Sequence, residues 1–141
     1  FNHKKWTKLG DLNQERTYST LIQYEYKNKL INIGGYNTNI NTINNVNVSK
    51  TVEVYDWIKS KWINLPNMFN THKKYPCAWI DYTHLNSYQG ILCVAGTGNQ
   101  NLNDCGNIEI YDFRLNKWQN IASLKNYFIN PKYKNKVLRR M

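Results

Sequence analysis

The nucleophilic and metal-binding residue types are few, and they lie far apart in the sequence. The cysteines are odd in number, and the histidines are scattered singly around them: Cys77, Cys93, Cys105, His3, His72 and His84. The sequence has no closely spaced Cys or His pair of the kind that holds zinc. The apolar surroundings of Cys77 and Cys93 predict buried, reduced thiols, which favours an intracellular, cytoplasmic location. We therefore expect no metal and no cofactor.

The polar residues that could act as acids or bases recur with a repeat, which predicts structural roles for them. Glu53 and Asp56 recur, with the same spacing between them, as Glu109 and Asp112. We expect them to be strand-face residues and turn acceptors, and we interpret His72 and His84 as surface histidines. Gly96-Thr97-Gly98 lacks the third glycine of a dinucleotide-binding loop, and the sequence has no Gly-x-Ser-x-Gly motif. We expect no catalytic residue and no enzymatic activity.

These carboxylates belong to a longer internal repeat. It is marked by three evenly spaced indole side chains, since the interval from Trp6 to Trp62 equals that from Trp62 to Trp118. Residues 51–56 match residues 107–112 at the same offset. Before each copy an apolar segment ends in two small residues, which are Gly34-Gly35 in the first copy and Ala95-Gly96 in the second. Such a repeat indicates that the chain is built from two similar units.

The elements that would position these residues are all strands. Alternation of apolar and polar residues, with β-branched and aromatic content, predicts four strands in each copy. They are residues 18–26, 29–33, 50–56 and 61–65 in the first copy, and 75–82, 91–95, 107–113 and 117–121 in the second. No segment has a helical period, so we expect an all-β fold. Four short antiparallel strands per unit are typical of a β-propeller blade.

The markers of the repeat resemble those of the kelch family. An apolar strand ending in Gly34-Gly35 is followed by Tyr55 and then by Trp62. The second copy has the same order, with the same interval between the two aromatic residues: Ala95-Gly96, Tyr111 and Trp118. The resemblance covers roughly residues 5–124 and implies about two complete four-stranded propeller blades with partial flanking blades. The implied division is 1–12 as the end of a preceding blade, 13–68 and 69–124 as two blades, and 125–141 as the start of a further blade or a basic tail.

Simple physics accounts for these residue types. A glycine doublet lets the chain turn sharply while another backbone passes close by, and we expect Ala95 to replace glycine where φ stays negative. The indole rings bring apolar area to the contact between neighbouring blades, and Tyr55 and Tyr111 are expected to pack there too. The remaining blades of the propeller would come from the parent chain or from other chains.

The kelch resemblance also implies a binding face, formed by the segments between blades and the loops after the doublets. These segments supply the expected partner contacts: Arg16, Tyr36, Asn37, His72, Lys73, Lys74 and Asn99. Arg16 resembles the position that commonly carries Arg in kelch repeats, and Lys73 or Lys74 is expected there in the second copy. Because Arg and Lys pair with carboxylates, the expected partner is an acidic protein or peptide.

The expected function is therefore that of a non-enzymatic protein–protein interaction module, such as the substrate receptor of a ubiquitin-ligase adaptor or a scaffold. The alternative is a propeller that supports an enzyme whose catalytic residues lie outside this chain.

The positive charge of the chain could indicate nucleic-acid binding, but the amino-acid composition offers a simpler explanation for that charge. The chain carries a net charge of +10, and residues 113–141 hold eight basic and no acidic residues. A basic tail could contact nucleic acid. However, the chain is also rich in asparagine, and AT-rich codons write both Asn and Lys, so we do not expect nucleic-acid binding. The longest apolar run, residues 91–95, is too short to cross a membrane, and no membrane partner is expected.

Overall fold

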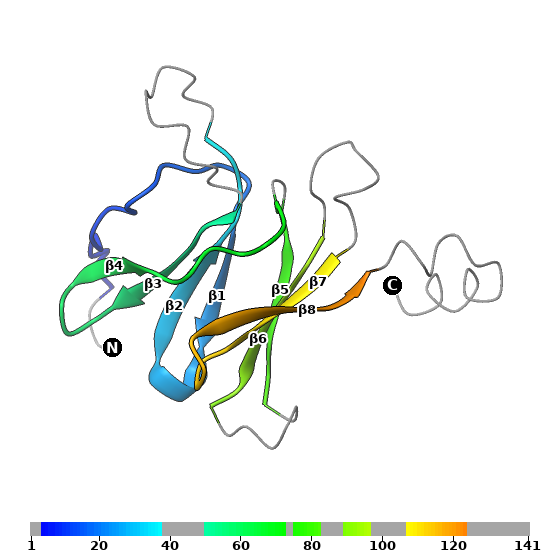
Figure 1. Cartoon of the computed structure of the whole chain (residues 1–141). Coiled ribbons are helices and arrows are strands. Elements are labelled where there is room, and N and C mark those ends of the chain that lie inside the picture. Colours follow the sequence, from blue (N-terminus) through cyan, green and yellow to red (C-terminus); the bar gives the residue numbers. More distant parts are fainter. Residues whose placement is uncertain (1–3, 38–49, 73–74, 83–88, 97–106, 124–141) are drawn as a thin grey trace.

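The computed structural model describes residues 4–37, 50–72, 75–82, 89–96 and 107–123 of the chain. They form two four-stranded antiparallel sheets (Figure 1). The first sheet contains β1 (Thr20–Tyr24), β2 (Lys29–Ile33), β3 (Val52–Asp56) and β4 (Lys61–Asn64), with a short 3-10 turn, η1 (Glu25–Lys27), after β1. The second sheet contains β5 (Cys77–Asp81), β6 (Ile91–Ala95), β7 (Asn107–Asp112) and β8 (Lys117–Ser123). The all-β prediction is confirmed, and each expected strand overlaps an observed one.

Within each sheet, consecutive strands are neighbours, so both sheets are simple meanders. The chain reverses at residues with left-handed backbone: Asn28, Ser60 and Asn116, at φ of 47°, 50° and 51°. Aspartates fix two of these turns, because Asp56 Oδ1 accepts bonds from the backbone N–H of Ile58 and Lys59, and Asp112 Oδ1 accepts one from Arg114. The prediction that these aspartates act as turn acceptors is confirmed.

One face of the first sheet packs against one face of the second. Strand pairing places Ile31 opposite Val54 and Ile33 opposite Val52, so these side chains share one face. They join one buried cluster with residues of the second sheet: Leu92, Val94, Tyr111 and Trp118. Tyr24 stacks on Phe113 with ring centroids 4.2 Å apart, and β1 lies beside β5. The main apolar core is therefore the contact between the two sheets.

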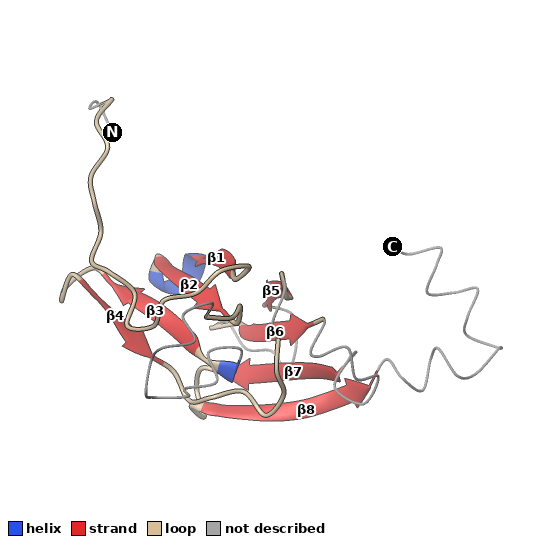
Figure 2. Ribbon diagram, turned by 90° about the horizontal axis from the view of Figure 1, so that it is seen from above, coloured by secondary structure: helices blue, strands red, loops and turns tan. Residues whose placement is uncertain are grey.

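Two of the three recurring indoles are buried and make the same two contacts, although only Trp118 belongs to the core cluster between the sheets. Trp62 and Trp118 are 8% and 3% exposed, and their rings lie 5.3 and 5.2 Å from Tyr55 and Tyr111. Each indole N–H donates to a backbone carbonyl at the same distance back along the chain: Trp62 to Gly10 at 2.8 Å and Trp118 to Pro66 at 2.7 Å. Each indole therefore bonds the segment that precedes its sheet to the last strand of that sheet, β4 or β8. Figure 2 shows the N-terminal segment beside β3 and β4.

Trp6 differs from these two residues, and the expectation that it packs in the same way is wrong. Its side chain is 98% exposed. No described strand pairs with the segment that carries Trp6, and the ring lies in solvent.

The strand register also corrects the alignment of the small-residue doublets. Ile33 pairs with Val52, whereas Ala95 pairs with Ile108, which is the equivalent of Val52 in the second copy of the repeat. Ala95 therefore occupies the place of Ile33 inside a strand, and Gly96 occupies the place of the first glycine of the doublet. The sequence comparison is off by one position here. The position equivalent to the second glycine lies outside the described residues.

The first doublet shows why glycine is needed there. Gly34 and Gly35 have φ of +63° and +88°, and a Cβ on Gly34 would lie 2.3 Å from the carbonyl oxygen of His72. The N–H of Gly35 donates to that same carbonyl at 2.8 Å. The end of β2 therefore touches the segment that links the two sheets, and the expected close passage of a second backbone is confirmed for this doublet.

Replacing Trp118 by alanine should destabilise the chain strongly, because the ring lies in the core between the sheets. We expect Trp118→Ala, and to a similar extent Trp62→Ala, to lower the free energy of unfolding by about 3–5 kcal/mol through loss of apolar contact and cavity formation. Urea unfolding followed by tryptophan fluorescence measures this. Trp6→Ala is the matched control and should change it by less than about 0.5 kcal/mol. Equal effects of Trp6→Ala and Trp118→Ala would contradict the packing described.

Candidate functional site

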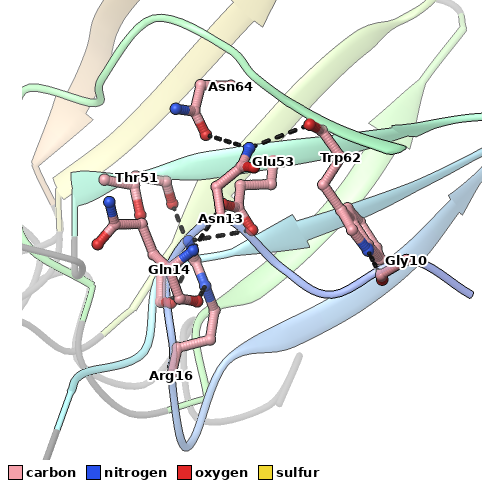
Figure 3. Close-up of polar contacts among 9 residues, drawn as sticks. Gly10, Asn13, Gln14, Arg16, Thr51, Glu53, Trp62 and Asn64 are labelled. Atoms are coloured by element: carbon pink, nitrogen blue, oxygen red, sulfur yellow. Dashed lines mark hydrogen bonds and ion pairs between the residues drawn. The ribbon is translucent and has the colours of Figure 1, made fainter. Parts of the chain in front are cut away.

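The segment before β1 is held by a buried ion pair. The side chains of Arg16 and Glu53 are both 0% exposed, and Arg16 Nη2 lies 3.5 Å from Glu53 Oε2. Arg16 Nη1 also donates to the carbonyls of Gly34 at 3.0 Å and Thr51 at 3.3 Å, and Glu53 accepts the N–H of Gln14 at 3.1 Å (Figure 3). The expectation that the Arg16 side chain contacts a partner is corrected here, because its guanidinium is inaccessible and joins β2, β3 and the N-terminal segment.

His72 repeats this arrangement in the second sheet. It occupies the position of the repeat that is equivalent to Arg16, and its Nε2 lies 2.8 Å from Glu109 Oε2, with both side chains 0% exposed. Glu109 also accepts the N–H of Phe69 at 2.6 Å and of Asn70 at 3.1 Å. The interpretation of His72 as a surface histidine is therefore wrong, and so is its use as a partner contact. His72 also holds the position at which Lys73 or Lys74 was expected.

Burial dominates the electrostatics of the Arg16–Glu53 pair. Loss of hydration raises the pKa of Glu53 and lowers that of Arg16, and in each case it outweighs the attraction of the partner charge. Such a pair is stable only when the remaining polar atoms are also bonded. Backbone groups of Gln14, Gly34 and Thr51 bond Glu53 Oε1 and Arg16 Nη1, whereas Arg16 Nη2 and Glu53 Oε2 face each other without a hydrogen bond. The pair therefore fixes the path of the chain and offers no free charge.

Three tyrosines lie together on the side of the sheets where β1 and β5 begin; we refer to Tyr18, Tyr36 and Tyr75 as the tyrosine cluster. The ring of Tyr18 stacks on that of Tyr36, with centroids 5.3 Å apart, and meets Tyr75 edge-on at 5.2 Å. Tyr18 and Tyr75 are 42% and 68% exposed. Sequence reasoning selected Tyr36 and missed the other two, although both come shortly before the first strand of a sheet.

The backbone of the tyrosine cluster has strained dihedral angles and is held by hydrogen bonds between its segments. Tyr18 and Tyr75 have positive φ, 55° and 45°, which is uncommon for aromatic residues. The N–H of Tyr75 donates to the carbonyl of Tyr18 at 2.7 Å, and Tyr36 bridges to Thr17. Strained residues held by surrounding bonds often lie at functional sites. The cluster therefore joins the entry segments of both sheets and holds its rings partly exposed.

An open pocket adjoins this cluster through Tyr36, and we name it the Tyr36 pocket. Its volume is about 560 Å³, and its described lining includes Asp11, Glu15, Thr17, Tyr36 and Asn37. Arg16 is also among the lining residues, although its side chain is inaccessible to solvent. Of the expected partner contacts, Arg16, Tyr36 and Asn37 thus line one pocket, and only the Arg16 side chain is inaccessible there. The other expected contacts, Lys73, Lys74 and Asn99, lie outside the described residues.

A second pocket of about 360 Å³ lies between the sheets, near Tyr24 and Phe113. Lys27 and Lys29 line it as well, together with apolar side chains of both sheets. It contains none of the expected partner contacts.

The cysteines do not form a metal site within the described residues. Cys93 is buried, as expected, and burial raises its pKa to about 11, whereas Cys77 is exposed and the prediction of its burial is wrong. The described part of the chain has no group of three His, Cys, Asp or Glu residues that could hold a metal ion. Nor does that part contain a helix of the length and hydrophobicity needed to cross a membrane.

Comparison with known proteins assigns no family to the chain. It matches no protein-family model, and no curated protein matches it.

Removing only the positive charge of the Arg16–Glu53 pair should strongly lower the free energy of unfolding. Arg16→Met leaves a buried carboxylate without its cation, and we expect a loss of about 3–5 kcal/mol in the free energy of unfolding. The double variant Arg16→Met/Glu53→Gln removes both charges and should be no less stable than Arg16→Met alone. Urea unfolding of the two single variants and the double variant measures the coupling. Additive losses would show that the two side chains act independently.

Proposed function

We propose that the two sheets are consecutive blades of a kelch-type β-propeller. The chain would then be a non-enzymatic module that binds a protein or peptide partner, in an adaptor or a scaffold. The repeated contacts of a buried glutamate with Arg16 or His72, the indole hydrogen bonds and the meander topology support equivalent units that stack face to face. Further blades of the parent chain or of other chains would continue this stacking, which hides the sheet edges of a propeller.

The observation that carries the binding role is the tyrosine cluster beside the Tyr36 pocket. Tyrosine offers a large, rigid contact area and a polar hydroxyl, and it is enriched where proteins bind one another. Here Tyr18 and Tyr75 stay exposed although they touch each other and are fixed by backbone bonds. A rigid aromatic surface next to an open pocket loses little entropy when a partner binds.

The positions of the recurring acidic groups also favour binding over catalysis. Glu53 and Glu109 are fully buried and accept bonds from backbone N–H groups, and Asp56 and Asp112 close turns. These carboxylates are therefore engaged in holding the fold, whereas the tyrosine cluster and the Tyr36 pocket present accessible aromatic and polar side chains.

Selection from a random peptide library displayed on phage, with the chain immobilised, tests this role. We expect enriched peptides whose affinity falls at least ten-fold for Tyr36→Ala and for Tyr75→Ala. Such losses are typical of aromatic residues at the centre of an interface. Synthetic copies of the enriched peptides, titrated by fluorescence anisotropy, give the affinities.

Tyr26→Ala is the matched control, because Tyr26 is 40% exposed but lies in η1, at the other end of β1 from the cluster. It should leave peptide affinity unchanged. Absence of any enriched peptide, or equal binding to all variants, would contradict the proposed function.

A further inference from the structure

We propose that the Tyr36 pocket and the tyrosine cluster bind a cationic side chain, a lysine or arginine of a basic peptide, instead of the acidic partner that the sequence predicts. This inference rests on the proposed function and specifies its partner.

Two of the basic side chains expected to contact a partner, Arg16 and His72, are not accessible, whereas Lys73 and Lys74 lie outside the described residues. The guanidinium of Arg16 is ion-paired to Glu53, and the His72 ring lies against Glu109, with all four side chains fully buried. A buried, paired charge cannot be reached by a carboxylate of a ligand without breaking the pair. The described part of the face therefore offers no accessible positive charge from these two residues.

Among the described residues that line the Tyr36 pocket, the accessible charges are negative. Glu15 is exposed and has no ion pair with another described residue. Asp11 lies 3.1 Å from Lys8, but their side chains are 84% and 81% exposed. An ion pair between two such exposed groups is weak and screened by salt, so a ligand cation can replace Lys8. Both carboxylates line the same pocket.

The rings beside the carboxylates add a second attraction for a cation. Ammonium and guanidinium groups bind over the faces of tyrosine rings, with a gain that grows as the site is desolvated. Tyr36 belongs to both the pocket and the cluster, so a cation seated near Glu15 lies beside an aromatic surface. The volume of about 560 Å³ is within the range of pockets that hold small ligands and side chains.

Titration of the full chain with two fluorescein-labelled peptides tests this proposal: Gly-Ser-Arg-Ser-Arg-Ser-Gly and Gly-Ser-Glu-Ser-Glu-Ser-Gly. The chain has a net charge of +10, so non-specific attraction favours the acidic peptide. We expect the opposite order, with the arginine peptide binding at least five-fold more tightly at about 0.15 M salt, where distant charges are screened.

Neutral variants locate the binding. Glu15→Gln and Asp11→Asn should each weaken binding of the arginine peptide by about two- to five-fold, as for ion pairs with partly exposed groups. Glu25→Gln is the matched control, because Glu25 is exposed but lies in η1. It should have no effect. Melting temperatures confirm that the variants are folded.

Three outcomes would overturn the inference: tighter binding of the acidic peptide, no binding of the arginine peptide, or unchanged binding after Asp11 and Glu15 are both neutralised. If library peptides still depend on Tyr36 and Tyr75 in those cases, the proposed binding function stands and only the partner class is wrong. If no peptide depends on these tyrosines, both proposals fail.

Discussion

The buried glutamate on the third strand of each sheet is the constraint on which the described structure depends. Glu53 and Glu109 sit where water is excluded, and an uncompensated carboxylate there would be very costly. Each therefore needs backbone N–H donors and a basic side chain from the segment that precedes its sheet. This need fixes the segment beside β3 or β7, and the neighbouring indole N–H adds a second attachment a few residues earlier.

The two copies satisfy the same constraint with different bases. The first uses a guanidinium, whose several N–H groups also reach the carbonyls of Gly34 and Thr51. The second uses an imidazole, which contacts Glu109, while Glu109 takes backbone bonds from Phe69 and Asn70. The carbonyl of His72 in turn receives the N–H of Gly35. The linking segment is thus bonded to both sheets, which explains why two units with few identical residues keep the same path.

Much of the fold could be predicted from the sequence, because alternation and turn residues specify strands locally. Lys29–Ile33 and Ile91–Ala95 are strands within the expected bounds. The doublet alignment was one position off, since a strand pattern alone does not fix the register with its neighbour. The burial of Arg16 and His72 was missed because charge usually indicates a surface position, although the two residues are equivalent in the repeat.

The remaining features of the site arise only from tertiary contacts. The exposure of Trp6 depends on which strands lie beside it, and local sequence does not carry that information. Tyr18 and Tyr75 were overlooked because their positive φ and mutual contact arise only when the two sheets meet. The hydrogen bond from the Tyr75 N–H to the Tyr18 carbonyl has a thermodynamic consequence, because it connects the segment before β5 to the segment before β1. A molecule that contacts both the Tyr18 and the Tyr75 ring would bind more tightly to the conformation in which the two sheets are packed together. By mass action, saturation with such a molecule shifts the docking equilibrium and raises the resistance of the whole assembly to heat. Binding of such a molecule would thereby be coupled to the contact between the two sheets.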